Sequence, residues 1–568
     1  MMRTFKQHHL RLTSLLDGQW EFVTDPHRVG HLQEWAVSFP LNHQSVYVPS
    51  CWNNELKMYD YEGVAWYRTH FTIHTNKHIR LIFHGVLGAT EIYVDGKLVG
   101  SHYGGFSAFE VVLPELMAGT HSLVVRTDSL HTHQTIPLER VDWFHYGGII
   151  RSVELQELPD VFIDKVRIQY KLNHFLKKSE VELTCSLRSL KHSNVNIPLT
   201  LSCNNVQFNV TDALVPAFGV KELTMHCQLD SIELWEVGNP HLYYFQLSTT
   251  DDDWIDRIGF RNVGVIGSDI AVNGNPIFLQ GVNRHEEHPE WGFAFPPKLM
   301  KKDLDIILDM GCNSIRGSHY PNSRYWLDLL DETGIAFWSE IPLWQFGPTH
   351  MADPIVQQRA SLMLREMVTE CYHHPSILFW SMNNECATET EEGFNFNKML
   401  VEQVRSLDDS RLVTFATDRA LSDVTLSLFD VIGINRYFGW YGGEVGEFEL
   451  FLQQYEEYSK QMGSYGKPVI MAEFGGAGIF GDIGWEENRM FSEDYQALIL
   501  ESALNIFKKD KQISGTYIWQ FADIRSDVPR FRDRARGFNN KGLVNEYRKP
   551  KLAYRSVKKI YLDWKKNE

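Results

Sequence analysis

The sequence lacks the surplus of basic residues that nucleic-acid-binding proteins have, and it lacks the regular cysteine spacing of disulfide-rich proteins. Lys and Arg total 55 against 72 Asp and Glu, which gives a formal charge of -17. Phosphate backbones and anionic membranes attract the opposite surplus, so neither nucleic acid nor a membrane surface is the expected partner. The seven cysteines are scattered without a C-x-x-C spacing, which favours free thiols in a reducing cytoplasm over a disulfide framework.

Targeting and membrane signals are also missing. Residues 1–9 lack the apolar stretch of a secretory leader, and no continuous apolar segment reaches the roughly 18 residues that a membrane helix needs. What is present is a chain of 568 residues that is 43% apolar and 22% charged. Such a composition is typical of a soluble globular protein, and the length indicates about three or four domains.

Two β-rich domains are predicted in the first 265 residues. In residues 80–99, two alternating apolar segments flank Asp95-Gly96, and both turn residues favour the positive φ of a tight hairpin. Residues 1–160 are therefore expected to form one all-β domain. Alternation returns at 181–187 and 243–248, and short strands over about 100 residues are typical of an immunoglobulin-like sandwich, which we place at 161–265.

Residues 266–568 predict a (β/α)₈ barrel. After a second hairpin at Asn273-Gly274, eight short apolar runs alternate with helical or loop segments, as such a barrel requires. These runs are 278–281, 314–316, 335–338, 377–381, 413–416, 431–434, 469–472 and 516–519. Helical spacing predicts two buried stripes, formed by Met300, Leu304, Ile307 and Leu308 with Gly311 at the helix end, and by Val356, Ala360, Met363, Met367 and Cys371.

Most of these runs are followed at once by polar or acidic side chains. Barrel enzymes bind their substrates at the C-terminal ends of the strands, so these side chains are expected to meet on one face. They include Asn283, His285, Glu286, His319, Glu340, Asn384, Glu385, Asp418, Asn435, Arg436, Glu473, Gln520 and Asp523.

Glu385 and Glu473, after the fourth and seventh runs, are the strongest catalytic candidates. Two carboxyls that face each other across a barrel mouth are the minimal apparatus for glycoside hydrolysis. Structural pairing of these acids with Arg316 or Arg436 is an equally open interpretation on spacing alone. A metalloenzyme is disfavoured, because the His-Glu-Glu-His sequence at 285–288 is one residue short of the H-E-x-x-H spacing.

Several longer motifs resemble glycoside hydrolase family 2, in the right order over nearly the whole chain. They are His-Tyr-Gly-Gly-Phe at 102–106, His-Tyr-Gly-Gly-Ile-Ile-Arg at 145–151, Arg-Ile-Gly-Phe-Arg at 257–261, Gly-Val-Asn-Arg-His-Glu at 281–286, Asn-Ser-Ile-Arg-Gly-Ser-His-Tyr-Pro at 313–321, Trp-Ser at 380–381 with Asn384-Glu385, Glu-Phe-Gly at 473–475 and Trp-Gln-Phe-Ala-Asp at 519–523. The resemblance implies an N-terminal jelly roll, an immunoglobulin-like sandwich and a catalytic barrel.

The resemblance also implies roles for single residues. Glu385 would be the general acid/base and Glu473 the nucleophile of a retaining double displacement, while Asn384 would bind the sugar 2-hydroxyl. His285 and Trp519 would belong to the sugar site, and Glu340 would hold neighbouring side chains in place. Glu385 is expected to begin protonated. No redox or metal cofactor is implied, and a homo-oligomer is expected.

Two further segments favour an exo-acting β-glucuronidase over the other activities of the family. Asn539 and Lys541 resemble the Asn-x-Lys pair that holds a C6 carboxylate, which a neutral sugar would leave unpaired. Asn435, Tyr437 and Tyr441 resemble the segment that lines the site near the nucleophile, so both tyrosines are expected to contact nucleophile and sugar. Asp142 resembles an aspartate that reaches a sugar hydroxyl from the jelly roll.

Some choices stay open at this point. The roles of Arg534 and Arg536 are unassigned, because their offset from Asn539 departs from the family pattern. Only 14 residues separate Glu340 from Ile355, so the loop that covers the aglycone in relatives is shorter here and a more open mouth is expected. The substrate is expected to be a small-molecule or oligosaccharide glucuronide. The alternatives are a β-galactosidase, a β-galacturonidase and a carbohydrate-binding protein without activity.

Overall fold

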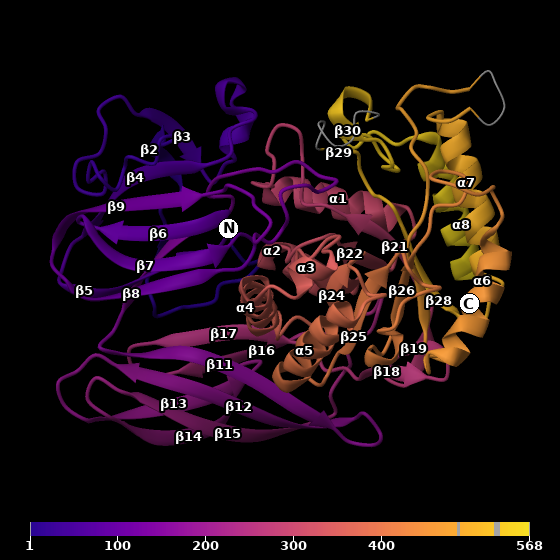
Figure 1. Cartoon of the computed structure of the whole chain (residues 1–568). Coiled ribbons are helices and arrows are strands. Elements are labelled where there is room, and N and C mark those ends of the chain that lie inside the picture. Colours follow the sequence, from indigo (N-terminus) through magenta and orange to yellow (C-terminus); the bar gives the residue numbers. More distant parts are fainter. Residues whose placement is uncertain (1, 485–488, 527–533, 567–568) are drawn as a thin grey trace.

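Two facing sheets form the N-terminal jelly roll of the computed structural model, which describes residues 2–484, 489–526 and 534–566 (Figure 1). One sheet has the order β1 (Thr13–Leu15), β10 (Val153–Leu158), β5 (Lys77–Phe83) and β8 (Phe109–Leu116). The other has the order β3 (Gln44–Val48), β2 (Gly18–Thr24), β4 (Val64–Ile73), β9 (Gly119–Asp128), β6 (Gly88–Val94) and β7 (Lys97–Gly104). Asp95 and Gly96 join β6 to β7 at φ 49° and 76°, which confirms the predicted hairpin.

The second domain is a sandwich of a three-stranded and a four-stranded sheet. The first contains β11 (Val161–Leu172), β12 (Lys178–Ser189) and β15 (Val220–Asp230). The second runs β14 (Val206–Val215), β13 (Val195–Cys203), β16 (Tyr243–Ser248) and β17 (Asp253–Ile258). Alternate residues of β12 and β13 are buried between the sheets, so the period-two pattern positions this core as predicted.

All eight predicted runs become strands of one closed parallel barrel, which follows a small antiparallel sheet of β18 (Val263–Ile266), β19 (Asp269–Val272) and β20 (Asn275–Ile277). Each barrel strand is buried on both faces, which explains its continuous apolar sequence. The strands are β21 (Leu279–Arg284), β22 (Ser314–Gly317), β23 (Ala336–Glu340), β24 (Ile377–Asn384), β25 (Leu412–Thr417), β26 (Ile432–Asn435), β27 (Val469–Glu473) and β28 (Ile513–Ile518).

Helices pack around the barrel through their apolar stripes. The apolar stripe of α4 is buried as predicted. In α1 the prediction for Leu308 is wrong, because this residue is 37% exposed. Leu308 lies one position beyond the buried face that Leu304 and Ile307 share. Gly311 takes a left-handed φ of 89° just past the end of α1. The helices are α1 (Pro297–Asp309), α2 (Arg324–Thr333), α3 (Pro348–Met351), α4 (Pro354–Cys371), α5 (Glu391–Leu407), α6 (Phe448–Gln461), α7 (Glu493–Phe507) and α8 (Leu552–Lys566).

The remaining elements are short. The 3₁₀ turns η1 (Trp52–Asn54) and η2 (Leu56–Met58) lie in the jelly roll and η3 (Leu426–Leu428) in the barrel. Beyond β28, a two-stranded sheet of β29 (Ile524–Arg525) and β30 (Phe538–Asn539), with η4 (Ala535–Gly537), lies beside the barrel. All seven cysteines are free thiols. Within the described residues, no helix is both long and apolar enough to cross a bilayer.

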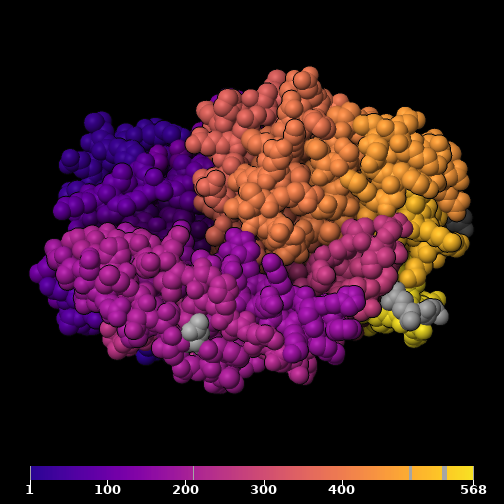
Figure 2. Space-filling view, turned by 90° about the horizontal axis from the view of Figure 1, so that it is seen from below, coloured from indigo at the N-terminus to yellow at the C-terminus, as the bar shows by residue number. Residues whose placement is uncertain are grey.

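The sandwich lies beneath the jelly roll and the barrel and contacts the barrel through the 257–261 motif (Figures 1 and 2). The buried guanidinium of Arg261 donates to the carbonyl oxygens of Pro375 and Ile377 at 2.5 and 2.6 Å, next to the start of β24. On the jelly-roll side, the Tyr146 hydroxyl donates to Glu287 at 2.7 Å. The Tyr146 contact holds a loop of the jelly roll against the face of the barrel where the strands end.

Candidate active site

Glu473 lies buried at the end of β27, where two side chains hold its carboxylate. Arg316, on β22, donates from Nη1 to Oε1 at 2.8 Å. The Tyr437 hydroxyl, in the loop after β26, donates to Oε2 at 2.6 Å. Each oxygen therefore has its own donor, and one of the two donors is a permanent cation. This arrangement fixes the orientation of the carboxylate.

Glu385 directly follows β24 and is held differently, by two neutral amides. Its Oε1 accepts a hydrogen bond from Asn435 Nδ2 at 2.8 Å, and its Oε2 accepts one from Gln345 Nε2 at 2.9 Å. The backbone of Glu385 is left-handed, with φ 52°. Glu385 is only partly buried, whereas Glu473 is 3% exposed. The two carboxyls thus differ in both solvation and bonding partners.

The two carboxyls are close enough to interact electrostatically. Burial, with the charge of Glu385 adding to it, raises the pKa of Glu473 to about 8 against the lowering effect of Arg316 and Tyr437. A raised pKa favours the protonated form of Glu473, whereas the sequence led us to expect the catalytic proton on Glu385. The reason is that Glu473 is the more deeply buried of the two.

Glu340 is the third acid of the mouth and lies in the interior of an ion network. Arg316 binds it in a bidentate fashion at 2.9 and 3.0 Å, and His319 contacts it at 2.6 Å. Although burial raises the pKa of Glu340, Arg316 and His319 together hold it below its usual value. The structural pairing of acids with Arg316 is thus present at both Glu340 and Glu473. Glu340 orients the arginine that in turn orients Glu473.

Asn384 and His285 each present a buried polar atom to the site. Asn384 Oδ1 accepts from Arg316 Nη2 at 2.7 Å and from Asn435 Nδ2 at 3.1 Å, while Asn384 Nδ2 has no partner among the described residues. His285 Nδ1 lies 3.2 Å from the Tyr320 hydroxyl, and its Nε2 is likewise without a partner in the described part of the chain. Such buried donors are costly unless a ligand binds them. We call Arg316, His319, Glu340, Asn384 and Glu473 the floor of the site.

Aromatic rings line the space above the floor. Trp519, 5% exposed, stacks on His319 with ring centroids 5.1 Å apart and meets His285 edge-on at 5.6 Å. Trp143, from the jelly roll, contacts the same two histidine rings. The flat ring faces and buried polar atoms together are typical of carbohydrate sites.

A second cluster, which we call the cationic end, gathers residues from three separate segments. Lys541 Nζ donates to the Tyr441 hydroxyl at 2.7 Å, and Arg534 Nη2 donates to the same oxygen at 3.1 Å. Arg534 Nη2 and Asn539 Nδ2 both donate to Asp142 Oδ2, at 2.7 and 3.0 Å. Lys541 and Asn539 are buried. Asp142, Tyr441, Arg534, Asn539 and Lys541 therefore form one hydrogen-bonded unit.

Tyr441 and Asp142 have other contacts than the sequence led us to expect, and the structure places Arg534 and Arg536, whose roles were left open. Tyr437 contacts Glu473 as predicted, but the hydroxyl of Tyr441 contacts the two cations. Asp142 uses both carboxylate oxygens within the protein, since Ser526 donates to Oδ1 at 2.9 Å. Arg534 and Arg536 separate: Arg534 lies in the cationic end, whereas Arg536 pairs with Glu546 and its side chain is 57% exposed.

Sequence reasoning missed Gln345 altogether. It lies in the middle of a loop, in a segment with no catalytic motif, and only a long-range contact brings it to Glu385. Ser526 was missed for the same reason. The pairing of Arg316 with carboxylates was predictable from the sequence, because an arginine at the end of a buried strand needs a carboxylate partner and several acids follow neighbouring strands.

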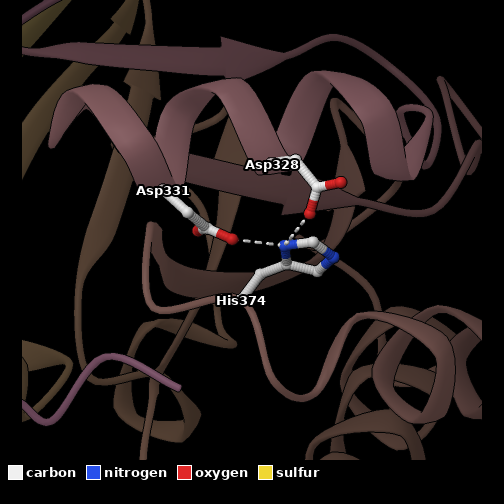
Figure 3. Close-up of side chains that lie close together, drawn as sticks. All are labelled: Asp328, Asp331 and His374. Carbon is white, nitrogen blue, oxygen red and sulfur yellow. Dashed lines mark hydrogen bonds and ion pairs between the residues drawn. The ribbon is translucent and has the colours of Figure 1, made fainter. Parts of the chain in front are cut away.

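The His-Glu-Glu-His segment gives no metal cluster among the described residues. Its Glu287 accepts from Tyr146 and its Glu286 pairs with Arg151 at 3.0 Å. The described residues do place Asp328 and Asp331, on α2, around Nδ1 of His374 (Figure 3). Those carboxylates are occupied, since Arg3 binds Asp328 with two bonds of 2.8 Å. The cluster is an ion-pair contact between the N-terminal segment and the barrel.

Comparison with known families gives the same three-part division. Family models match residues 13–159, described as the sugar-binding domain of glycosyl hydrolases family 2, residues 161–261, described as glycosyl hydrolases family 2, and residues 263–566, described as the family's TIM barrel domain. The chain belongs to glycoside hydrolase family 2. This membership makes it a glycoside hydrolase and confirms the predicted jelly roll, immunoglobulin-like sandwich and barrel. The membership favours the predicted enzyme over the alternative of a carbohydrate-binding protein without activity.

Several members of family 2 are similar over most of the chain. A crystal structure of a family 2 β-galacturonidase from Eisenbergiella tayi bound to galacturonate has a TM-score of 0.92 and 33% identity, with 99% of both chains covered. A β-glucuronidase from Paenibacillus borealis is 26% identical over 96% of both chains. A protein from Formosa agariphila is 28% identical over 90% of this chain, and the match covers 66% of that longer protein.

Proposed function

We propose that this family 2 enzyme is a retaining exo-β-glucuronidase that hydrolyses β-D-glucuronides. The observation that carries the proposal is the meeting of Lys541 and Arg534 at the Tyr441 hydroxyl, in the same mouth as the two candidate catalytic carboxyls. Two cations and the Asn539 amide, held together in a largely buried site, suit a carboxylate far better than a neutral hydroxymethyl group. A uronic acid has that carboxylate on C6.

The first chemical step forms a covalent glycosyl-enzyme. Glu473 attacks the anomeric carbon while Glu385 gives its proton to the glycosidic oxygen, so the C1–O bond to the aglycone breaks as the bond from Glu473 to C1 forms. Arg316 and Tyr437 hold Glu473 in the orientation for attack. Asn384 Nδ2 supplies a donor for the 2-hydroxyl, a contact that strengthens as positive charge develops on the sugar ring.

The second step returns the enzyme to its starting state. Glu385, now ionised, takes a proton from water, and the resulting hydroxide attacks C1 and releases Glu473. A proton at the site near neutral pH is consistent with this cycle, because the pKa of Glu473 is raised to about 8. A sugar bound between the two groups moves that proton to Glu385, because Glu473 then faces the electron-poor C1.

Asp142 has a positioning role in this scheme. Its carboxylate orients Arg534 and Asn539 beside Lys541, so that these three side chains face the C6 carboxylate of the substrate. Tyr441 is 61% exposed although its hydroxyl is bound, and its ring forms an outer wall beside the sugar. The cationic end therefore selects the sugar, and the floor carries out the chemistry.

A β-galacturonidase is the second candidate. It is favoured by the 33% identity to the β-galacturonidase from Eisenbergiella tayi, which exceeds the 26% identity to the β-glucuronidase from Paenibacillus borealis. Glucuronides and galacturonides differ only in the configuration at C4 and carry the same C6 carboxylate. The same cationic end serves both.

The test is hydrolysis of the 4-nitrophenyl β-D-glycosides of glucuronic acid, galacturonic acid and galactose by the wild type and Glu473→Ala. The proposal expects the glucuronide to have the highest kcat/KM and Glu473→Ala to lose about 10⁴-fold or more. Proton NMR of the first sugar released distinguishes retention from inversion. Preference for the galacturonide selects the second candidate, and equal rates for wild type and Glu473→Ala reject both.

We also propose a cytoplasmic location, which seven free thiols support. The homo-oligomer expected from the family resemblance stays a prediction, and light scattering on the purified chain measures it.

A further inference from the structure

The short segment after β23 pairs with the end of β24. Asn384 N donates to the Leu343 carbonyl oxygen at 2.8 Å, and Gln345 N donates to the Asn384 carbonyl oxygen at 2.9 Å. Ala387 N continues the pairing to Phe346 at 2.9 Å. The short loop after Glu340, which is expected to leave the mouth open, therefore lies along the end of β24, directly beside Glu385. Its path is fixed by backbone hydrogen bonds rather than by its length.

This pairing places Gln345 beside Glu385. Both residues have left-handed backbones, with φ 55° for Gln345 and 52° for Glu385. Few residues other than glycine adopt that region, so the loop keeps a strained backbone at the point where it approaches the carboxyl. The Gln345 amide then donates from Nε2 to Glu385 Oε2 at 2.9 Å.

A chain of donors that starts at Arg316 fixes the orientation of the Asn435 amide beside Glu385. The guanidinium of Arg316 only donates, so the atom of Asn384 that it contacts at 2.7 Å is the carbonyl oxygen. The same oxygen also contacts Asn435, whose facing atom must therefore be the amide nitrogen. That nitrogen donates to Glu385 Oε1 at 2.8 Å, so each oxygen of Glu385 accepts one amide hydrogen bond, Oε1 from Asn435 and Oε2 from Gln345.

We propose that Gln345 is a positioning residue for the general acid, because it holds Oε2 of Glu385 as the oxygen that carries the proton. One lone pair of Oε2 accepts from Gln345, and the proton on the other is directed at the glycosidic oxygen. When the Oε2–H bond breaks, the proton goes to the leaving oxygen and its electron pair stays on Oε2. The Gln345 amide then stabilises the carboxylate that remains and that takes a proton from water in the second step. This inference rests on the proposed function.

The test compares substrates that need acid catalysis with one that needs little. 4-Nitrophenolate is a good leaving group and departs without protonation, whereas the methoxide of methyl β-D-glucuronide must be protonated as it leaves. A general acid that is wrongly positioned therefore slows hydrolysis of methyl β-D-glucuronide most. In Gln345→Gly, which tolerates the positive φ, we expect kcat/KM for methyl β-D-glucuronide to fall by about 10–100-fold and that for 4-nitrophenyl β-D-glucuronide by less than about threefold. Tyr437→Phe is the matched control, because the hydroxyl that it removes donates to Glu473 and not to Glu385, so we expect it to lower both rates alike.

A second variant tests the electrostatic part. Gln345→Glu keeps the shape but puts another carboxylate beside Oε2, which raises its proton affinity. We expect the alkaline limb of kcat/KM to move to higher pH, while the melting temperature stays close to that of the wild type. If both Gln345 variants slow the two substrates equally and leave the pH profile unchanged, the inference is overturned and the proposed function stands. A wild type that hydrolyses no uronide overturns both.

Discussion

The floor and the cationic end are both built around cations, but their construction differs. In the floor, Arg316 on a barrel strand is shared by Glu340, Glu473 and the Asn384 amide, with no exposed surface. In the cationic end, the groups come from a jelly-roll loop, the loop after β26 and the segment beyond β28. A site on rigid strands holds reacting groups in place, whereas a site assembled from loops is able to change with the substrate.

Removing the charge of Arg316 is expected to have the largest effect. Arg316→Met leaves Glu340 and Glu473 buried without their cation, so we expect kcat/KM to fall by about 10³-fold or more and the free energy of unfolding by about 3–5 kcal/mol. Activity on all three 4-nitrophenyl glycosides and urea denaturation are the measurements. Arg436→Lys is the control, since Arg436 reaches Glu473 only through its backbone N–H. Similar losses in both variants would contradict the proposed floor.

A change in the cationic end should instead alter selectivity. Lys541→Met removes the ammonium that contacts Tyr441, so we expect kcat/KM for the glucuronide to fall by about 10²–10³-fold with little change for the galactoside. The ratio of the two rates is the measurement. Lys549→Met, at an exposed position eight residues on, is the matched control. An equal loss on both substrates would place Lys541 in the chemistry rather than in recognition.

The contrast between strand-built and loop-built parts of the site also explains which residues could be predicted from the sequence. The eight strands follow from continuous apolar runs, and Glu385 and Glu473 follow from their position at strand ends. Gln345 could not be found, because a backbone pairing between 343–346 and 384–387 brings it to Glu385. Arg534 and Arg536 are chemically identical, and the left-handed backbone of Arg536, at φ 59°, is part of what directs them apart.

Asp142 provides a smaller test of the loop-built region. Asp142→Asn keeps the size of the side chain but removes the charge that Arg534 binds, so we expect KM for the glucuronide to rise by about 10-fold with kcat nearly unchanged. Steady-state kinetics separate the two parameters. Ser526→Ala, which loses only the bond to Oδ1, should change KM by less than about threefold. A fall in kcat with KM unchanged would mean that Asp142 acts in the chemical step, as the floor does, and not in substrate binding.

The smallest expected effect concerns the pH dependence of stability at the floor. The pKa of Glu473 is about 8 in the folded chain and about 4.5 in the unfolded one, so the folded state holds the extra proton between those values. Folding is therefore favoured below about pH 4.5, and this contribution is lost as pH rises through about 8. The groups that face Glu473 are Arg316, His319, Tyr437 and Glu385.

Glu473→Gln does not titrate, so its free energy of unfolding should decline less between pH 5 and 8 than that of the wild type. Urea denaturation at several pH values gives the two slopes. Glu385→Gln removes the neighbouring charge that raises the pKa of Glu473, so its slope should lie between them. Parallel curves for all three proteins would mean that Glu473 is ionised in the folded chain throughout. In that case the lowering effect of Arg316 and Tyr437 outweighs burial, and Glu473 takes up no proton on folding.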